Sequence, residues 1–213
     1  MFRRIVCVVA LFYLSACTHI GGQIKKDAKL GDKVAQYHLG LLYEEGKGIP
    51  KNYPEAVKWY VLSAEHGNFK AQYQLAGMYA MGKGVIQDNR KAFMWYKAAA
   101  IQNYEKAQLE LANMYEEGSG IPQNSEKAFQ WYKKSAQQGG IDAQKILANK
   151  YERGKGDFQN YAKAYCWYCV AVALGDIEAV QDRDRIGKDL PPAEKLMAQT
   201  RATELFDMMQ NMQ

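Results

Sequence analysis

The two cysteines of the segment Cys166-Trp167-Tyr168-Cys169 are the side chains best suited to redox chemistry. A catalytic Cys-x-x-Cys pair needs a thiolate stabilised at a helix N-terminus. Helical periodicity instead places both cysteines inside a helix, where the Cα atoms of residues i and i+3 lie about 5 Å apart, within the range that a disulfide bridges. Cys166 and Cys169 are therefore either a structural disulfide or two small apolar core residues. Redox catalysis and metal binding stay open as further alternatives.

The serines and histidines form no hydrolase or metal motif. The sequence lacks Ser-x-x-Lys, because lysine does not stand three positions after Ser63, Ser119, Ser125 or Ser135. The three histidines have no zinc-binding spacing, and a catalytic triad would have to use His19, His38 or His66. We therefore expect no catalytic residue, no metal site and no cofactor, and we expect that the protein is not an enzyme.

Cys17 stands where a lipid could be attached. Arg3 and Arg4 precede an apolar stretch, residues 5–14, which is too short to span a bilayer as a helix and is typical of a secretory signal. The following Leu14-Ser15-Ala16-Cys17 resembles the lipobox of bacterial lipoproteins. This resemblance implies that residues 1–16 are a signal peptide and that Cys17 carries acyl chains such as palmitate. An ordinary cleaved secretory signal is the alternative.

A lipid anchor would hold the folded protein close to a membrane. Residues 17–30 would form a short tether, and Thr18 stands where the resemblance calls for Asp in proteins retained at the inner membrane. We therefore expect attachment to the bacterial outer membrane, facing the periplasm. The net charge of +5 over 213 residues is mild and interspersed, so it indicates no nucleic-acid partner.

The elements that must position these side chains follow from a repeat of 36 positions. A leucine recurs at this spacing, as Leu39, Leu75, Leu111 and Leu147. So does a Trp-Tyr pair, as Trp59-Tyr60, Trp95-Tyr96, Trp131-Tyr132 and Trp167-Tyr168. Gly-x-Gly, tyrosine and alanine rows keep the same spacing. With 48% hydrophobic residues, these rows supply a core, and we expect the tyrosines and tryptophans to lie in it.

Each repeat predicts two helices. In the first repeat, Ala35, Leu39 and Tyr43 share one face of the first helix, which ends at Gly46. The second helix follows a short polar residue that caps its N-terminus, namely Asn52, Asp88, Asn124 or Asn160. Beyond a partial fifth copy at Ala179, a last helix should bury Ala198, Ala202, Leu205 and Met209.

These motifs resemble the Sel-like repeat family, a relative of the tetratricopeptide array, over residues 31 to about 183. The matching pattern is Ala-x-x-x-Leu-Gly-x-x-Tyr, then Gly-x-Gly, Asp or Asn, and Trp-Tyr. The predicted fold is all-α: an α-solenoid of 36-residue helix-turn-helix repeats in residues 31–190, with a C-terminal capping helix in residues 191–213. Some family members have been described as β-lactamases, but those carry paired cysteines in each repeat, which this chain lacks.

By analogy with tetratricopeptide arrays, the first helices line a concave groove that binds a partner. The predicted groove residues are Tyr37, Leu41, Glu44, Glu45, Tyr73, Met81, Leu109, Asn113, Glu116, Glu117, Lys145, Asn149, Glu152 and Arg153. Apolar and aromatic side chains flanked by carboxylates suit a peptide or helix with basic residues. The sequence therefore predicts a membrane-anchored protein–protein interaction scaffold of the cell envelope, whose partner is another envelope protein or peptide. Binding of cell-wall glycan or polysaccharide, and a β-lactamase-type hydrolase, are the alternatives.

Overall fold

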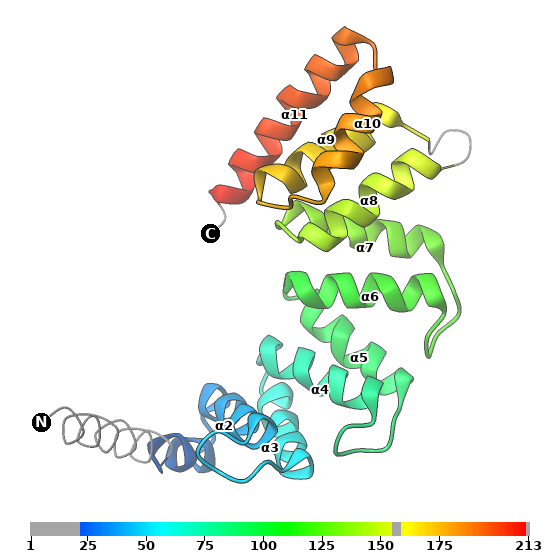
Figure 1. Ribbon diagram of the computed structural model, residues 1–213. Helices are drawn as coiled ribbons and strands as arrows, with labels where there is room; N and C mark the ends of the chain where they lie inside the picture. The colour runs from blue at the N-terminus through cyan, green and yellow to red at the C-terminus, as the bar shows by residue number, and fades with distance from the viewer. Residues whose placement is uncertain (1–21, 155–158, 212–213) are drawn as a thin grey trace, which may run out of the picture. The chain divides into compact units, whose positions relative to one another are not determined.

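The computed structural model describes residues 22–154 and 159–211, which contain helices and no β-strand (Figure 1). The predicted signal peptide and Cys17 lie outside the described residues. The segment predicted as a tether differs from expectation, because residues 22–29 are helical. Ala28 in this segment is buried, and its carbonyl accepts a hydrogen bond from the Gln36 side chain. The end of the predicted tether therefore belongs to the folded protein.

The chain divides into two compact units, Met1–Gln102 and Asn103–Gln213. In the first unit, consecutive helices pack on one another: α2 (Lys33–Glu45), α3 (Tyr53–Glu65), α4 (Phe69–Met81) and α5 (Asn89–Ala100). The second unit repeats this arrangement with α6 (Glu105–Glu117), α7 (Ser125–Gln137), α8 (Ile141–Arg153) and α9 (Tyr161–Ala173). It ends with α10 (Ala179–Asp189) and α11 (Pro192–Gln210), which both pack on α9.

The predicted helix boundaries are confirmed by their capping geometry. The side-chain oxygens of Asn52, Asp88, Asn124 and Asn160 each accept a hydrogen bond from a backbone amide in the first turn of the second helix. The first helices end at Gly46, Gly82 and Gly118 in the left-handed conformation, which glycine adopts without a Cβ clash. Gly154 departs from this row, with a φ of −57°.

The core is built from the repeated rows. Leu75, Leu111 and Leu147 are fully buried, and Leu39 is 2% exposed. The tyrosines of the Trp-Tyr pairs are buried as predicted, but the tryptophans differ: Trp59, Trp95 and Trp131 are half-buried, and only Trp167 among the four is buried. The tyrosine, rather than the tryptophan, therefore fills the space between the two helices of a repeat.

The last helix has one packed face and one free face. Its buried residues are those that the sequence predicts, Ala198, Ala202, Leu205 and Met209, and they belong to the same core cluster as α9. Leu196 and Met197 on α11 are largely exposed. The helix thus covers α9 at the end of the second unit, as a capping helix does.

A row of buried glutamines at the 36-residue spacing connects successive helices through hydrogen bonds. Gln36, Gln72, Gln108 and Gln144 follow the 36-residue spacing and are at most 6% exposed. The amide nitrogens of three of them donate to the carbonyl eight residues earlier. Each repeat therefore contains a polar contact inside an otherwise apolar core, and the spacing that revealed the leucines could have revealed it.

Candidate functional site

In the first unit, the predicted groove residues lie on α2 and α4. The Tyr37 ring stands 6.1 Å from the Tyr60 ring, centroid to centroid, and Tyr73 stands 5.6 Å from Tyr96. Leu41 packs against the core cluster of this unit. The side chains of Tyr37, Leu41 and Tyr73 are half-buried, so they present only part of their apolar surface to a partner.

The carboxylates of the first unit have partners within the chain. The hydroxyl of the buried Tyr60 donates to Glu44 at 2.6 Å. Burial, assisted by this hydrogen bond and the nearby Glu44 charge, raises the pKa of Tyr60 well above its usual range. Glu45 is exposed and forms an ion pair with Lys47 at 2.7 Å. Met81, 59% exposed, is the predicted groove residue of this unit that offers the most free apolar surface.

In the second unit, a first-helix carboxylate pairs with a basic side chain on the next first helix. Lys150 on α8 binds Glu116 on α6 at 2.9 Å. One repeat further on, Arg185 on α10 binds both carboxylate oxygens of Glu152 on α8. The pairing repeats with similar spacing. The negative charge of each of these two glutamates is therefore neutralised by a basic side chain of the protein itself.

Some of the remaining polar side chains of the predicted groove also form hydrogen bonds or ion pairs within the chain. Tyr132 donates to Asn113 at 2.8 Å, and Tyr168 donates to Glu152 at 3.3 Å. Burial raises the pKa of each of these two tyrosines to about 12. Lys145 binds Asp176 and Glu178. Leu109 packs against the core, whereas Glu117 and Arg153 are exposed.

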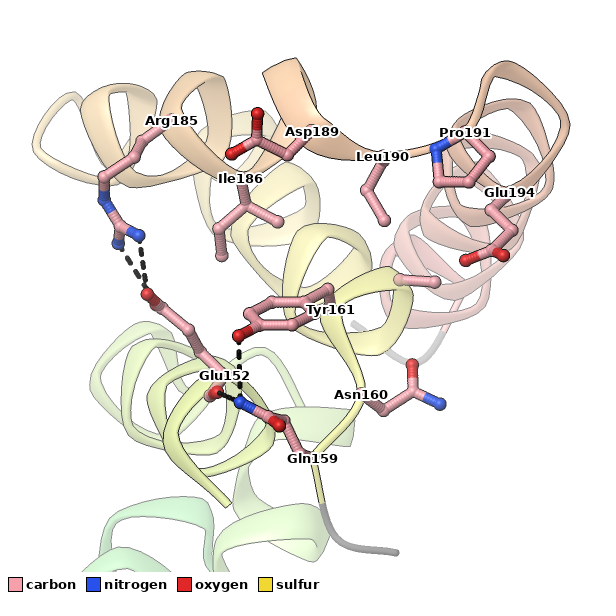
Figure 2. A pocket seen from close by; sticks show the side chains of 11 residues that line it. Glu152, Gln159, Asn160, Tyr161, Arg185, Ile186, Asp189, Leu190, Pro191 and Glu194 are labelled. Atoms are coloured by element: carbon pink, nitrogen blue, oxygen red, sulfur yellow. Dashed lines mark hydrogen bonds and ion pairs between the residues drawn. The ribbon is translucent and has the colours of Figure 1, made fainter. Parts of the chain in front are cut away.

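Two pockets in the second unit occupy equivalent places in successive repeats. The first, of about 690 Å³, lies between α6, α7 and α8, and its lining includes Glu116, Asn149, Lys150 and Arg153. The second, of about 660 Å³, is lined at the positions 36 residues later by Glu152, Arg185, Ile186 and Asp189 (Figure 2). Four predicted groove residues thus line these pockets: Glu116, Asn149, Glu152 and Arg153.

The cysteine pair of α9 consists of free thiols. Cys166 is 5% exposed and Cys169 is half-buried. Burial raises the pKa of Cys166 to about 12, with the neighbouring Cys169 adding to the shift, and burial also raises the pKa of Cys169. Because the thiolate is the reactive form, these cysteines are poorly suited to redox catalysis. They contribute to the core cluster of the second unit instead.

No other chemical site stands out in the part of the chain that the structure describes. Among those residues, no group of three or more His, Cys, Asp or Glu side chains could hold a metal ion. Over the same residues, no helix is both long and apolar enough to cross a bilayer. The surface of the first helices, with its pockets, is therefore the candidate site.

Comparison with known proteins identifies the repeat. The Sel1 repeat model matches residues 33–68, 69–104, 105–140 and 141–176, so each match holds one pair of helices. The chain belongs to the Sel1 repeat family. Sel1 repeat proteins are generally protein–protein interaction scaffolds and are typically not enzymes.

Two solved structures share the Sel1 fold over most of this chain. A Sel1 repeat protein from Oxalobacter formigenes is 29% identical, with a TM-score of 0.73 over 86% of this chain and 78% of that chain. A protective antigen of uropathogenic Escherichia coli that displays an SLR fold is 28% identical, with a TM-score of 0.75 over 91% of this chain and 43% of that chain. The predicted α-solenoid class is thereby confirmed.

Curated relatives match over shorter stretches. The putative sel1-like repeat-containing protein L18 of Acanthamoeba polyphaga mimivirus is 44% identical over 45 residues, which are 21% of this chain. The DAP3-binding cell death enhancer 1 of Rattus norvegicus is 49% identical over 41 residues, or 19% of this chain. The match spans 8% of the length of each of these relatives, about one repeat.

Proposed function

We propose that this Sel1 repeat protein is a scaffold anchored to the bacterial outer membrane through Cys17, and that it binds another envelope protein on its first-helix face. We define this face within each unit, by the solvent-facing side chains of α2 and α4 in the first unit and of α6 and α8 in the second. The proposal of an anchor is supported by the basic start, the short apolar stretch and the Leu-Ser-Ala-Cys sequence before residue 18. The proposal of a scaffold is supported by the family's general role.

One observation carries the choice of the first-helix face. Internal pairs, such as Tyr60 with Glu44 and Arg185 with Glu152, hold its side chains in fixed positions. Around them, side chains of different character stay exposed, among them Met81, Glu117 and Arg153. A rigid frame that displays varied side chains suits recognition of a protein, because little side-chain entropy is lost on binding.

The anchor and the binding face require separate tests. Cys17→Ala should abolish incorporation of a palmitate analogue and release or misprocess the protein, because cleavage of this signal class is coupled to acylation and hydrophobic anchoring depends on the acyl chains. Equal labelling of the variant and the wild type would contradict the lipid anchor. Cys7→Ser changes a cysteine within the proposed signal peptide. It is the matched control and should leave labelling unchanged.

The partner is tested by affinity capture of the full-length protein from detergent-solubilised envelopes, followed by mass spectrometry. We expect one envelope protein to be enriched, and we expect Met81→Ala with Glu117→Lys to weaken its capture. Lys97→Glu with Lys133→Glu, on exposed second-helix positions, is the control and should have little effect. Loss of capture in the control alone would move the binding surface to the second helices, and enrichment of peptidoglycan without protein would favour glycan binding.

A further inference from the structure

The pocket drawn in Figure 2 has two carboxylates that have no partner among the residues that the structure describes. Its charged lining side chains are Glu152, Arg185, Asp189 and Glu194. Arg185 is occupied by Glu152, through both guanidinium nitrogens, and by Asp182. The side-chain carboxylates of Asp189 and Glu194 form no hydrogen bond or ion pair with another described residue. The pocket therefore carries an excess negative charge that this part of the chain does not neutralise.

The wall of the same pocket is apolar. Ile186 and Leu190 in its lining are buried, and Pro191 follows them in the lining between α10 and α11. The Tyr161 ring lies across the space from Ile186 (Figure 2), with 49% of the residue exposed. Its hydroxyl accepts a hydrogen bond from the Gln159 amide, which also donates to the Glu152 carbonyl. The ring is thus held in place beside a partly open apolar surface.

We propose, on the basis of the scaffold function above, that this pocket receives a lysine or arginine side chain from an extended segment of the partner protein. The methylene stem of such a side chain would lie along Ile186 and Leu190, and the Tyr161 ring would face it. Long basic side chains bury their stems in this way while the charged head stays near water or an anion. The head group would be bound by Asp189 and Glu194, which supply opposite charge at the rim.

The charges of the equivalent pocket one repeat earlier are less favourable to a basic side chain than the charges of this pocket. There Lys150 takes the place of Ile186, and Arg153 takes the place of Asp189. Lys150 is paired with Glu116, and Gln130 donates to Glu126, another lining residue. Among the residues that the structure describes, the lining of the earlier pocket has as many basic as acidic side chains, and its Arg153 would repel a cation. Most described lining residues of the earlier pocket have an equivalent 36 residues later in this pocket, and the two linings differ in charge, so the earlier pocket serves as a control.

The test measures binding of short peptides to the full-length protein in detergent. The probe is a fluorescein-labelled peptide, Gly-Ser-Leu-Arg-Leu-Ser-Gly, with blocked ends, and it is compared with peptides that carry Lys, Gln or Glu in place of Arg. Fluorescence anisotropy gives the dissociation constants at low and high salt. We expect the Arg and Lys peptides to bind at least fivefold more tightly than the Gln peptide, and high salt to reduce that preference.

Variants assign the preference to the pocket. Asp189→Asn with Glu194→Gln should remove the preference for Arg and Lys and leave binding of the Gln peptide unchanged. Glu126→Gln, in the earlier pocket, should preserve the preference. The inference would be overturned if all four peptides bound equally, if the Glu peptide bound more tightly, or if no peptide bound up to millimolar concentration. It would also be overturned if the double variant kept the preference for Arg and Lys.

The same variants separate this inference from the proposed function. Capture of an envelope protein that persists in Asp189→Asn with Glu194→Gln would leave the scaffold function standing and refute the role of this pocket. Failure of the wild type to capture any envelope protein would refute the scaffold function, and the peptide measurements would still report on the charge preference of the pocket. Circular dichroism and the melting temperature should be unchanged in the double variant, because both carboxylates are exposed.

Discussion

The hydroxyl of Tyr60 donates a 2.6 Å hydrogen bond to the carboxylate of Glu44, sixteen residues earlier in the chain. Tyr60 is fully buried between the two helices of its repeat, and Glu44 lies on the face predicted to bind a partner. The ring packs so closely on α2 that a Cβ at Gly40 would lie 2.6 Å from it. One side chain therefore fills the core and fixes a side chain of the candidate binding face.

Removal of this hydrogen bond should destabilise the repeat. Tyr60→Phe leaves the ring in place and deprives Glu44 of its donor, so we expect a loss of about 1.5 to 3 kcal/mol in the free energy of unfolding, as for hydrogen bonds to charged groups. Urea unfolding of Tyr60→Phe, Glu44→Gln and the double variant, as a double-mutant cycle, measures the coupling. Additive effects of the two substitutions would contradict a direct interaction.

The buried tyrosines also predict alkaline sensitivity. Tyr60, Tyr132 and Tyr168 have raised pKa values in the folded protein, so the folded state holds these protons more tightly than the unfolded state. Their stabilising effect is complete below the unfolded pKa of about 10 and is lost as the pH rises through the folded pKa. Melting temperatures should fall above about pH 10, and the fall should be smaller in Tyr60→Phe. An equal alkaline fall in the variant would assign the effect to other groups.

The tyrosine and tryptophan of one Trp-Tyr pair should differ in their contribution to stability. Tyr96 is 8% exposed, whereas its neighbour Trp95 is half-buried. Tyr96→Ala should lower the free energy of unfolding by about 3 to 5 kcal/mol, as for large buried aromatic side chains. Trp95→Ala should lower it by about 2 kcal/mol, because the half-buried tryptophan removes less apolar surface from water than a buried side chain does. Thermal unfolding ranks the two variants, and a larger loss for Trp95→Ala would show that the tryptophan is the principal core residue.

The glutamine row predicts opposite effects of two substitutions at equivalent positions. Gln138 donates to the Oε1 atom of Gln108 at 2.6 Å. The residue that corresponds to Gln138 in the next repeat is Leu174, and the buried Oε1 atom of Gln144 has no hydrogen-bond partner among the described residues. Gln138→Leu should destabilise the protein by about 1 to 2 kcal/mol, and Leu174→Gln should stabilise it by up to about 1 kcal/mol. Chemical unfolding provides both values. Destabilisation by Leu174→Gln would mean that the apolar packing of Leu174 outweighs the hydrogen bond.

The two cysteines of α9 should remain reduced and unreactive in the folded state. Their raised pKa values keep the thiolate population low at neutral pH. We therefore expect slow labelling by a thiol reagent that accelerates on unfolding, and the same melting temperature with and without reductant. A melting temperature that falls on addition of reductant would instead indicate a stabilising disulfide between Cys166 and Cys169.

The sequence was sufficient for those features that depend on local chemistry. Asn52 and its equivalents cap helices through amides two or three residues away, and Gly46 ends a helix through its own backbone, so the 36-residue spacing predicted both. The buried face of α11 followed from helical periodicity in the same way.

Features that depend on contacts between repeats could not be predicted in this way. Glu116 and Glu152 are predicted to face a partner, but their ion pairs with Lys150 on α8 and Arg185 on α10 could not be read from the sequence. The pocket at Asp189 was missed because it forms where the repeat pattern has faded and α10 takes the place of a first helix. Half-burial of Trp95 likewise depends on how neighbouring helices cover it.

The central claim, that the first-helix face binds an envelope protein, is tested most directly by photo-crosslinking in living cells. A photoreactive benzoylphenylalanine is placed at Met81 or Glu117 on first helices, and at Lys97 or Lys133 on second helices, in the full-length protein. All four positions are exposed, so the substitutions should preserve the fold. We predict that Met81 and Glu117 crosslink to one envelope protein and that the second-helix positions do not. Crosslinks to that protein from Lys97 and Lys133 alone would contradict the account, as would their absence from all four positions.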